Sequence, residues 1–506
     1  MVKIYAIFIL LYLMFRNQQL LVKKRFIKSS TKIVVAVFLT LPFTAVIADI
    51  QPRSASLNYS QKSLSNAGNP AAAALIVERK DPHVMTGGII ELGAGVEYGD
   101  LDELFAKIDE LNNDFNPPSV PNAPEQPPQP SNPDRDYQWE DIFNEYPDLE
   151  DRLDIVKSKV ATTVGLLALI TAEGYAKAEA NGEATFVLNE NLYGGTLMFG
   201  TSYKGNAQVV GLFQDIDFDA NQAKEQLQTL PDFSETDPIQ ALDLSGGITL
   251  FYDPANKKMK LMVDNDSLLL VKATQISQIS LSYSRKLQAY ENGSLYWGIK
   301  PTFYRVGLTN VSAKIGAITD SEALFDDIEN ADFVFENGFD LDLGLVWAAP
   351  NYQVGASLIN LIEQKYKFPE LDRTAFKSAK IISQLSKHEI YTMERQLKLE
   401  AGVFTDLRHW SLNVELDANS ISDPMSDDYQ WLTVTGGYAA DSWWLPSARL
   451  GFSRNLAGTK LAYVNAGVTV MKFLNIDIAT TLDTVTLDGD EVNRGIHIRL
   501  GVQFDY

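Results

Sequence analysis

The sequence predicts an all-β fold, a transmembrane antiparallel β-barrel of about 12–14 strands. The end of the chain carries the clearest evidence, because every second residue from Ile496 to Tyr506 is large and apolar and the residues between are polar or glycine. Strand side chains alternate between two faces, so one face of this segment is apolar and the other polar. The same alternation recurs over 339–347, 397–404 and 410–417. After Asp49 no apolar stretch reaches the length of a spanning helix, whereas a closed barrel can span with strands.

A soluble β-sandwich would show the same period, with its apolar face in a core. Two features favour the barrel. Six tryptophans fall at or near predicted strand ends, as an interfacial belt requires; they are Trp297, Trp347, Trp410, Trp431, Trp443 and Trp444. The polar face is rich in charge, as a water-filled lumen allows; it carries Asp340, Asp342, Lys398, Glu400, Glu415, Asp417 and Arg499.

The first 48 residues are predicted to be a secretory signal peptide. Seven Lys or Arg and no acid precede Asp49, and a basic cluster at 23–32 is followed by the apolar run 33–48. The run ends in Val46-Ile47-Ala48, so we expect cleavage between Ala48 and Asp49. The alternative is a transmembrane anchor, for which the run is short. Translation starts at Met1 or, in a shorter leader, at Met14.

Charge and composition exclude several function classes. The mature chain has 36 Lys and Arg against 65 Asp and Glu, a net charge of −29, so nucleic acid is not an expected partner. There is no cysteine, which excludes disulfides and thiol chemistry, and the four histidines lack metal-ligand spacing. No G-x-S-x-G motif or other catalytic constellation occurs. We expect no enzyme activity, no cofactor and no metal.

The mature N-terminal part has a different organisation. We expect a hatch-like segment over 49–84, a first barrel strand over 85–98 and a helical insertion over 99–181. The insertion contains the Pro-rich linker 116–133, with eight prolines. It is predicted to be a periplasmic element, a surface element or a piece inside the lumen. The main part of the barrel occupies 182–506.

Two family resemblances follow from these segments. Asn69-Pro70-Ala71-Ala72 resembles the hatch motif of long-chain fatty-acid transporter (FadL-like) barrels, which assigns Asn69 and Pro70 to the hatch. The segments 338–345, 352–355, 396–402 and 412–417 are similar to a Cys-free outer-membrane barrel family named conjugal transfer protein TraF. A thioredoxin-like protein shares that name, but the absence of a CxxC motif separates it from this chain.

The C-terminal strand also resembles the signal by which Gram-negative outer-membrane barrels are inserted, which assigns Phe504 and Tyr506 to assembly. The resemblance therefore implies Sec-type export to the outer membrane, with its lipid and the barrel insertion machinery as partners. It also implies conjugation-apparatus proteins as partners, in a structural or assembly role. The alternative is a FadL-like channel for a small hydrophobic solute, which would need an apolar pocket in the lumen or a gap in the wall.

Overall fold

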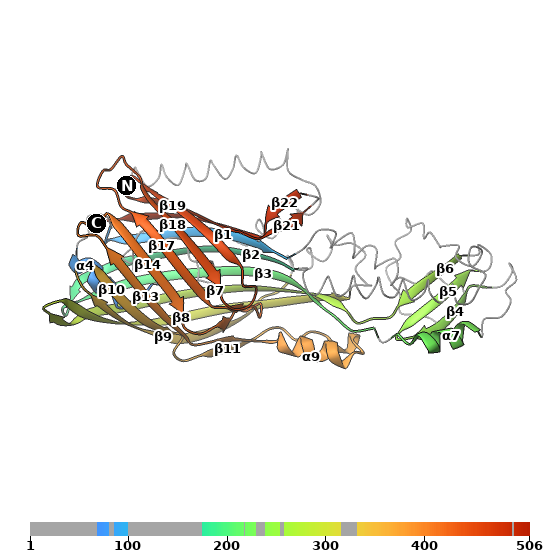
Figure 1. Ribbon diagram of the computed structural model, residues 1–506. Helices are drawn as coiled ribbons and strands as arrows, with labels where there is room; N and C mark the ends of the chain where they lie inside the picture. Colours follow the sequence, from blue (N-terminus) through green and yellow to red (C-terminus); the bar gives the residue numbers. More distant parts are fainter. Residues whose placement is uncertain are drawn as a thin grey trace, which may run out of the picture.

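The computed structural model describes residues 68–79, 85–99, 175–216, 218–228, 238–253, 258–314, 331–487 and 490–505. The predicted signal peptide 1–48 with its Ala48–Asp49 cleavage site, the Pro-rich linker 116–133 and Tyr506 lie outside these residues. Within them the chain forms a closed antiparallel barrel of fourteen strands (Figure 1). This confirms the predicted fold class and the upper value of the predicted strand number.

Around the wall the strands follow chain order, and β23 closes the barrel against β1. In that order they are β1 (Gly88–Tyr98), β2 (Tyr175–Leu192), β3 (Gly195–Leu212), β7 (Leu268–Tyr290), β8 (Gly293–Lys314), β9 (Val334–Ala348), β10 (Tyr352–Ile359), β13 (Gln396–Phe404), β14 (Trp410–Asp417), β17 (Trp431–Tyr438), β18 (Ser447–Asn455), β19 (Ala462–Val470), β20 (Leu474–Thr481) and β23 (Gly495–Phe504). Among the described residues, no helix has the length and apolarity needed to cross a membrane.

The alternation predicted from sequence sets the two faces of the wall. In β23, Ile496 and Ile498 are exposed on the outer face, whereas His497 and Gln503 are buried on the lumen side. Large apolar side chains such as Leu345 are exposed along the outside of the other strands too. The outer face is therefore an apolar belt suited to lipid, as a membrane barrel requires.

The two ends of the barrel differ. Gly88 and Phe504, the ends of β1 and β23, are register partners and mark what we call the terminal end. Connections at this end are short, for example residues 193–194, where Tyr193 and Gly194 both have positive φ values, as a tight hairpin turn requires. Most connections at the opposite, far end are longer, with 456–461 as the exception, and β7 and β8 have 23 and 22 residues against eight in β14.

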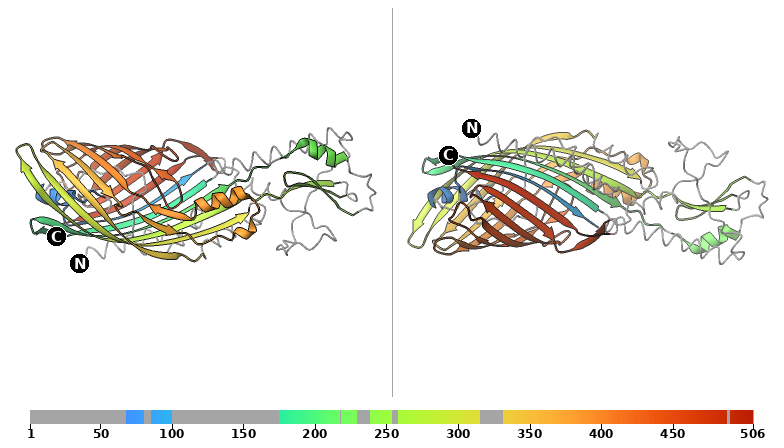
Figure 2. Two further views of the ribbon diagram at one scale, coloured as in Figure 1. Left: turned by 90° about the horizontal axis from the view of Figure 1, so that it is seen from below. Right: turned by 90° about the horizontal axis from the view of Figure 1, so that it is seen from above.

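Small elements gather at the far end. A three-stranded sheet of β4 (Gln240–Ser245), β5 (Ile248–Asp253) and β6 (Lys258–Val263) lies beyond the barrel with α7 (Ala220–Gln228) beside it (Figures 1 and 2). Between β10 and β13 lie β11 (Gln364–Lys367), the short 3-10 helix η2 (Arg373–Ala375), α9 (Ala379–Lys387) and β12 (Ile390–Met393). Two further hairpins are β15 (Ile421–Ser422) with β16 (Asp428–Tyr429), and β21 (Thr484–Leu487) with β22 (Asp490–Asn493).

Two details differ from the sequence prediction. Strand β2 begins at Tyr175, inside the range 99–181 assigned to the insertion. Its first residues alternate alanine with Lys177 and Glu179, a composition that favours helix locally, but both charged side chains are buried on the lumen face. Trp431 was predicted at the interfacial belt but is buried in the lumen, where it packs between Tyr429 and Tyr463. In both cases barrel closure, not local composition, decides the position.

Candidate functional site: the barrel lumen

The lumen wall carries buried charges that are paired with charges on nearby strands. Lys300 and Asp342 are register partners on β8 and β9 and form an ion pair of 2.7 Å. Arg449 donates to Asp477 at 2.5 Å, with both side chains almost fully buried. The predicted lumen face is thereby confirmed for Asp340, Asp342, Glu415 and Asp417, all of which are buried. Buried charges need such partners because the cost of removing a charge from water is offset only by attraction to an opposite charge nearby.

A segment with the predicted hatch residues lies in the lumen near the terminal end. Residues 68–79, called the hatch segment here, end in the short helix α4 (Ala72–Arg79). The side-chain amide of Asn69 donates to the carbonyl oxygens of Leu345 (3.2 Å) and Ala356 (3.1 Å) and to Glu400 Oε1 (3.0 Å). Its Oδ1 accepts from the backbone N–H of Ala71 at 3.0 Å. Asn69 thus joins the start of α4 to three strands of the wall.

Two glycines of the wall allow this approach. A Cβ added at Gly298 would lie 2.2 Å from the carbonyl oxygen of Pro70, and one at Gly344 would lie 2.1 Å from Oδ1 of Asn69. Both distances are far shorter than a van der Waals contact, so any side chain there would displace the hatch backbone. The close approach explains why glycines interrupt the alternation of β8 and β9 at these points.

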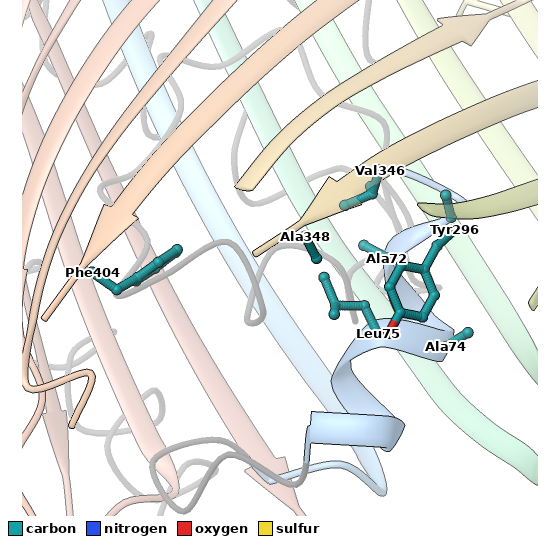
Figure 3. Packing of buried hydrophobic residues seen from close by; sticks show 8 residues of the cluster. Ala72, Ala74, Leu75, Tyr296, Val346, Ala348 and Phe404 are labelled. Atoms are coloured by element: carbon teal, nitrogen blue, oxygen red, sulfur yellow. The ribbon is translucent and has the colours of Figure 1, made fainter. Parts of the chain in front are cut away.

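Apolar packing and further bonds hold α4 in place. Leu75 lies beside Tyr296 and Ala348 of the wall, and Val346 and Phe404 belong to the same buried cluster (Figure 3). On another side, Ile76 packs with Ile89, Val187 and Met198. At the end of the helix, Arg79 donates to Gln353 Oε1 at 2.8 Å and to the carbonyl of Ala349 at 2.9 Å. The hatch segment is therefore an integral part of the lumen at the terminal end.

A second segment enters the lumen from the far end. Residues 418–430, called the lumen hairpin here, connect β14 to β17 and contain β15 and β16. The hairpin is tightly closed. The N–H of Asp423 donates to the carbonyl of Asp427 at 2.8 Å, the N–H of Ser426 donates to the carbonyl of Asp423 at 2.9 Å, and Asp423 Oδ1 accepts from the N–H of Asp427 at 2.8 Å. Asp423, Met425 and Tyr429 are buried.

The lumen hairpin is bound to the opposite wall. Lys177 of β2 donates to Asp423 at 2.7 Å, to Asp427 at 3.1 Å and to the hydroxyl of Tyr429. In the ring of fourteen strands, β2 and β14 are seven places apart, half of the circumference. The hairpin thus crosses the lumen. Removing one partner of such a buried pair costs about 3–5 kcal/mol, since the other charge is left uncompensated.

Burial affects the ionisation of the hairpin. Desolvation raises the pKa of the Asp423 carboxyl, and the nearby Lys177 ammonium only partly opposes this effect. Desolvation also raises the pKa of the Tyr429 phenol well above its ordinary value, so it is a neutral hydrogen-bonding group at physiological pH. The ion pairs between the hairpin and the wall therefore join Lys177 to two carboxylates, those of Asp423 and Asp427.

Glu97 organises the wall beside this contact. It accepts from the hydroxyl groups of Tyr175 (2.7 Å) and Tyr463 (2.7 Å). His497 of the last strand lies 3.0 Å from Glu179 and edge-on to Tyr463. A small cavity remains between this group and the hairpin, lined by Gly95, Val96, Glu97, Lys177, Glu179, Tyr429, Trp431 and His497.

The predicted site residues have different outcomes. Asn69 and Pro70 lie in the lumen as described, and Phe504 is at the terminal end, with its ring 5.9 Å from that of Phe186. Tyr506, Ala48 and Asp49 lie outside the described residues. Within the described ranges no group of three His, Asp or Glu side chains could hold a metal ion. Sequence reasoning missed Lys177, Asp423 and Asp427, although a polar turn between two strong strands was a visible signal.

A family model described as "F plasmid transfer operon, TraF, protein" matches residues 66–417, well over half of the chain. The chain belongs to this TraF family. The matched range begins at the hatch segment and ends with β14, directly before the lumen hairpin.

Solved structures similar to this TraF-family chain include two hydrocarbon transport proteins. They are the TodX deltaS2S3 mutant monoaromatic hydrocarbon channel (10% identity, 90% of this chain and 95% of that chain, TM-score 0.32) and the Ralstonia pickettii toluene transporter TbuX (10% identity, 91% and 96%, TM-score 0.34). These loose superpositions add nothing to the fold that the strand topology itself establishes. No curated protein matches the chain.

Proposed function

We propose that this protein is an outer-membrane barrel with a structural or assembly role in a conjugal-transfer-type system. Membership of the TraF family and the lipid-suited outer face support this proposal. The proposed partners are outer-membrane lipid, the barrel insertion machinery and proteins of the transfer apparatus. The proposal assigns no catalytic activity and no cofactor.

The two ends of the barrel suggest its orientation. Outer-membrane barrels have short periplasmic turns and longer extracellular loops. By that rule the terminal end faces the periplasm and the far end faces the exterior. The attachment points of the 99–174 connection, Tyr98 and Tyr175, are at the far end, so both this connection and the β4–β6 sheet start outside the cell.

The observation that carries the proposal is the long ribbon of β7 and β8. These strands continue past the shorter half of the barrel, and the start of β7, together with the end of β3, leads into the β4–β6 sheet (Figure 2). Side chains bind this ribbon to α9, because Asp266 accepts from Lys314 at 2.6 Å and from the N–H of Ser378 at 2.6 Å. A supported extension outside the cell is suited to binding a partner and is not needed for passive diffusion.

The lumen supports the same choice. A channel for a hydrophobic solute would need an apolar path, whereas the wall carries buried ion pairs, and the hatch segment and lumen hairpin both occupy the lumen. The FadL-like channel therefore stays the second candidate. Heat-modifiable migration and recovery of the protein in the outer-membrane fraction test the part common to both candidates.

The transfer role is tested in the host by deleting the gene and measuring plasmid transfer frequency. Complementation uses the full chain and a variant in which 217–263 is replaced by a short Asn-Gly turn. The ends of this segment are already held together, because Asn265 Nδ2 donates to the carbonyl of Gln214 at 3.1 Å and the N–H of Asp266 donates to its Oε1 at 2.8 Å.

We expect gene deletion to reduce transfer, the full chain to restore it, and the shortened variant to assemble normally without restoring it. Unchanged transfer after gene deletion would refute the transfer role. Full restoration by the shortened variant would refute the part assigned to the extension.

A further inference from the structure

Three lysines lie close together on the lumen wall behind the hairpin. Lys177, Lys204 and Lys272 belong to the adjacent strands β2, β3 and β7 and have exposed fractions of 5%, 1% and 2%. We call these three residues the basic ledge. Lysine side chains are rarely fully buried, because removing the ammonium group from water is costly.

The strand register orders the ledge in rows. Gln208 of β3 is the partner of both Lys177 and Lys272, so these three residues form the outermost row. One level deeper, Asn206 is the partner of both Glu179 and Thr274, and Lys204 follows one level below. Adjacent strands are about 4.8 Å apart, so the rows form one continuous polar surface.

Both rows have unused hydrogen-bonding capacity. Within the described part of the chain, the side-chain amide of Asn206, Oε1 of Gln208 and the hydroxyl of Thr274 are buried and have no hydrogen-bond partner. Their exposed fractions are 1%, 5% and 0%. Buried polar groups are normally paired, so such a concentration indicates a place where water or a ligand binds.

The lumen hairpin covers this surface from the exterior side. Asp423 and Asp427 bind Lys177, and Lys272 donates to the hydroxyl of Ser426 at 3.2 Å. The two lysines that bind the hairpin, Lys177 and Lys272, belong to the outermost row, whereas Thr274 lies one row deeper. The hairpin carboxylates thus occupy the positions that the anionic group of a ligand would take.

We propose that the lumen hairpin is an outer gate over a binding site for a small solute with an anionic group, a carboxylate or a phosphate. The basic ledge supplies the charge, and Asn206, Gln208 and Thr274 supply neutral hydrogen bonds. When the hairpin moves away, its two carboxylates leave with it. The remaining acids nearby are engaged, since Glu97 accepts from two tyrosines and Glu179 lies against His497.

The absence of cysteine makes a direct test simple. Thr274→Cys places a single thiol on the ledge, and its modification is timed with an anionic and a cationic methanethiosulfonate of similar size. The gate is weakened by Asp423→Asn with Asp427→Asn, or by Asp427→Asn alone if the double variant fails to assemble. Lys177→Met with Lys272→Met then removes the two charges of the outermost row, and Lys365→Met, at an exposed lysine of β11, is the matched control.

In the Thr274→Cys parent we expect slow modification by both reagents. In the gate variants we expect the thiol to be modified by the anionic reagent about tenfold faster than in the parent, and about tenfold faster than by the cationic reagent. Charged clefts concentrate counter-ions on this scale. The Met pair should abolish this preference, Lys365→Met should not, and inorganic phosphate or acetate should slow the anionic reagent.

Each other result overturns part of the proposal. Equal rates in the parent and the gate variants would show that the hairpin is not a gate. An equal or faster cationic reagent in the gate variants would show that the ledge is not an anion site. Protection by phosphate but not acetate selects the phosphate class, the reverse selects the carboxylate class, and protection by neither refutes the site. Heat-modifiable migration checks that every variant is folded.

Discussion

Docking of the hatch segment should depend on the absence of a side chain at Gly298. In Gly298→Ala the new methyl carbon would lie 2.2 Å from the carbonyl oxygen of Pro70 and 2.5 Å from the nitrogen of Ala71. Both are backbone atoms, so the clash cannot be relieved by a rotamer change, and the hatch must move by about 1 Å to restore ordinary contact.

The magnitude follows from two contributions. Overpacking of a well-packed site costs about 1–3 kcal/mol. A shift of that size also weakens the bonds from Asn69 to Leu345, Ala356 and Glu400, each worth about 1 kcal/mol. We expect docking to lose about 2–4 kcal/mol, which corresponds to a change of roughly 30- to 1000-fold in the docked-to-released ratio.

Amide hydrogen exchange of the hatch segment is the direct assay. The N–H of Ala74 donates to Ser284 Oγ of β7, so it exchanges only when the hatch is released from the wall. The N–H groups of Ala71 and Ala72 are bonded to Asn69 within the hatch segment and report the opening of its first turn. Gly436→Ala is the matched control, since its Cβ would meet only the carbonyl oxygen of Ser411, at 4.0 Å. Exchange in Gly298→Ala that equals the wild type would refute the reasoning.

Three further predictions concern assembly and the far end. Changing Phe504 and Tyr506 to Ser should strongly reduce the amount of heat-modifiable barrel, because the lipid-facing end of the closing strand is lost; normal barrel levels would contradict this. Deleting 116–133 should leave barrel migration unchanged, because prolines cannot join a ladder, and a loss of assembly would mean that the segment packs inside the fold. Protease nicking of the region around α9 should increase as pH falls. Burial lowers the pKa of the His388 imidazole from 6.5 to about 4, so the stability that neutral His388 contributes to the docking of α9 is complete above pH 6.5 and is lost between pH 6.5 and about 4. Below pH 3.8 the docking of α9 should weaken further through Asp266. Burial alone would raise the pKa of this carboxyl, but Lys314 and the N–H groups of Ser378 and Lys377 hold the pKa below 3.8. The stability that the ionised carboxylate contributes is therefore lost as Asp266 is protonated. A pH-independent nicking rate would refute both assignments.

The sequence by itself determined the fold class and the faces of the strands. In β23 the period of two placed Ile496 and Ile498 outside and His497 and Gln503 inside, as the structure has them. This works because the alternation is a property of the extended backbone and needs no knowledge of distant residues. The same holds for Asp340 and Asp342, whose burial follows from their position opposite the apolar residues of β9.

The site, in contrast, depends on contacts that only barrel closure creates. Asn69 meets Glu400 across 331 positions of sequence, and Lys177 meets Asp423 across 246. Strand order around the ring and the inward direction of the 418–430 connection bring these residues together, and neither is encoded in the local period. Local pattern fixes which way a side chain points, whereas the groups that it meets in the lumen are decided by the closed wall as a whole.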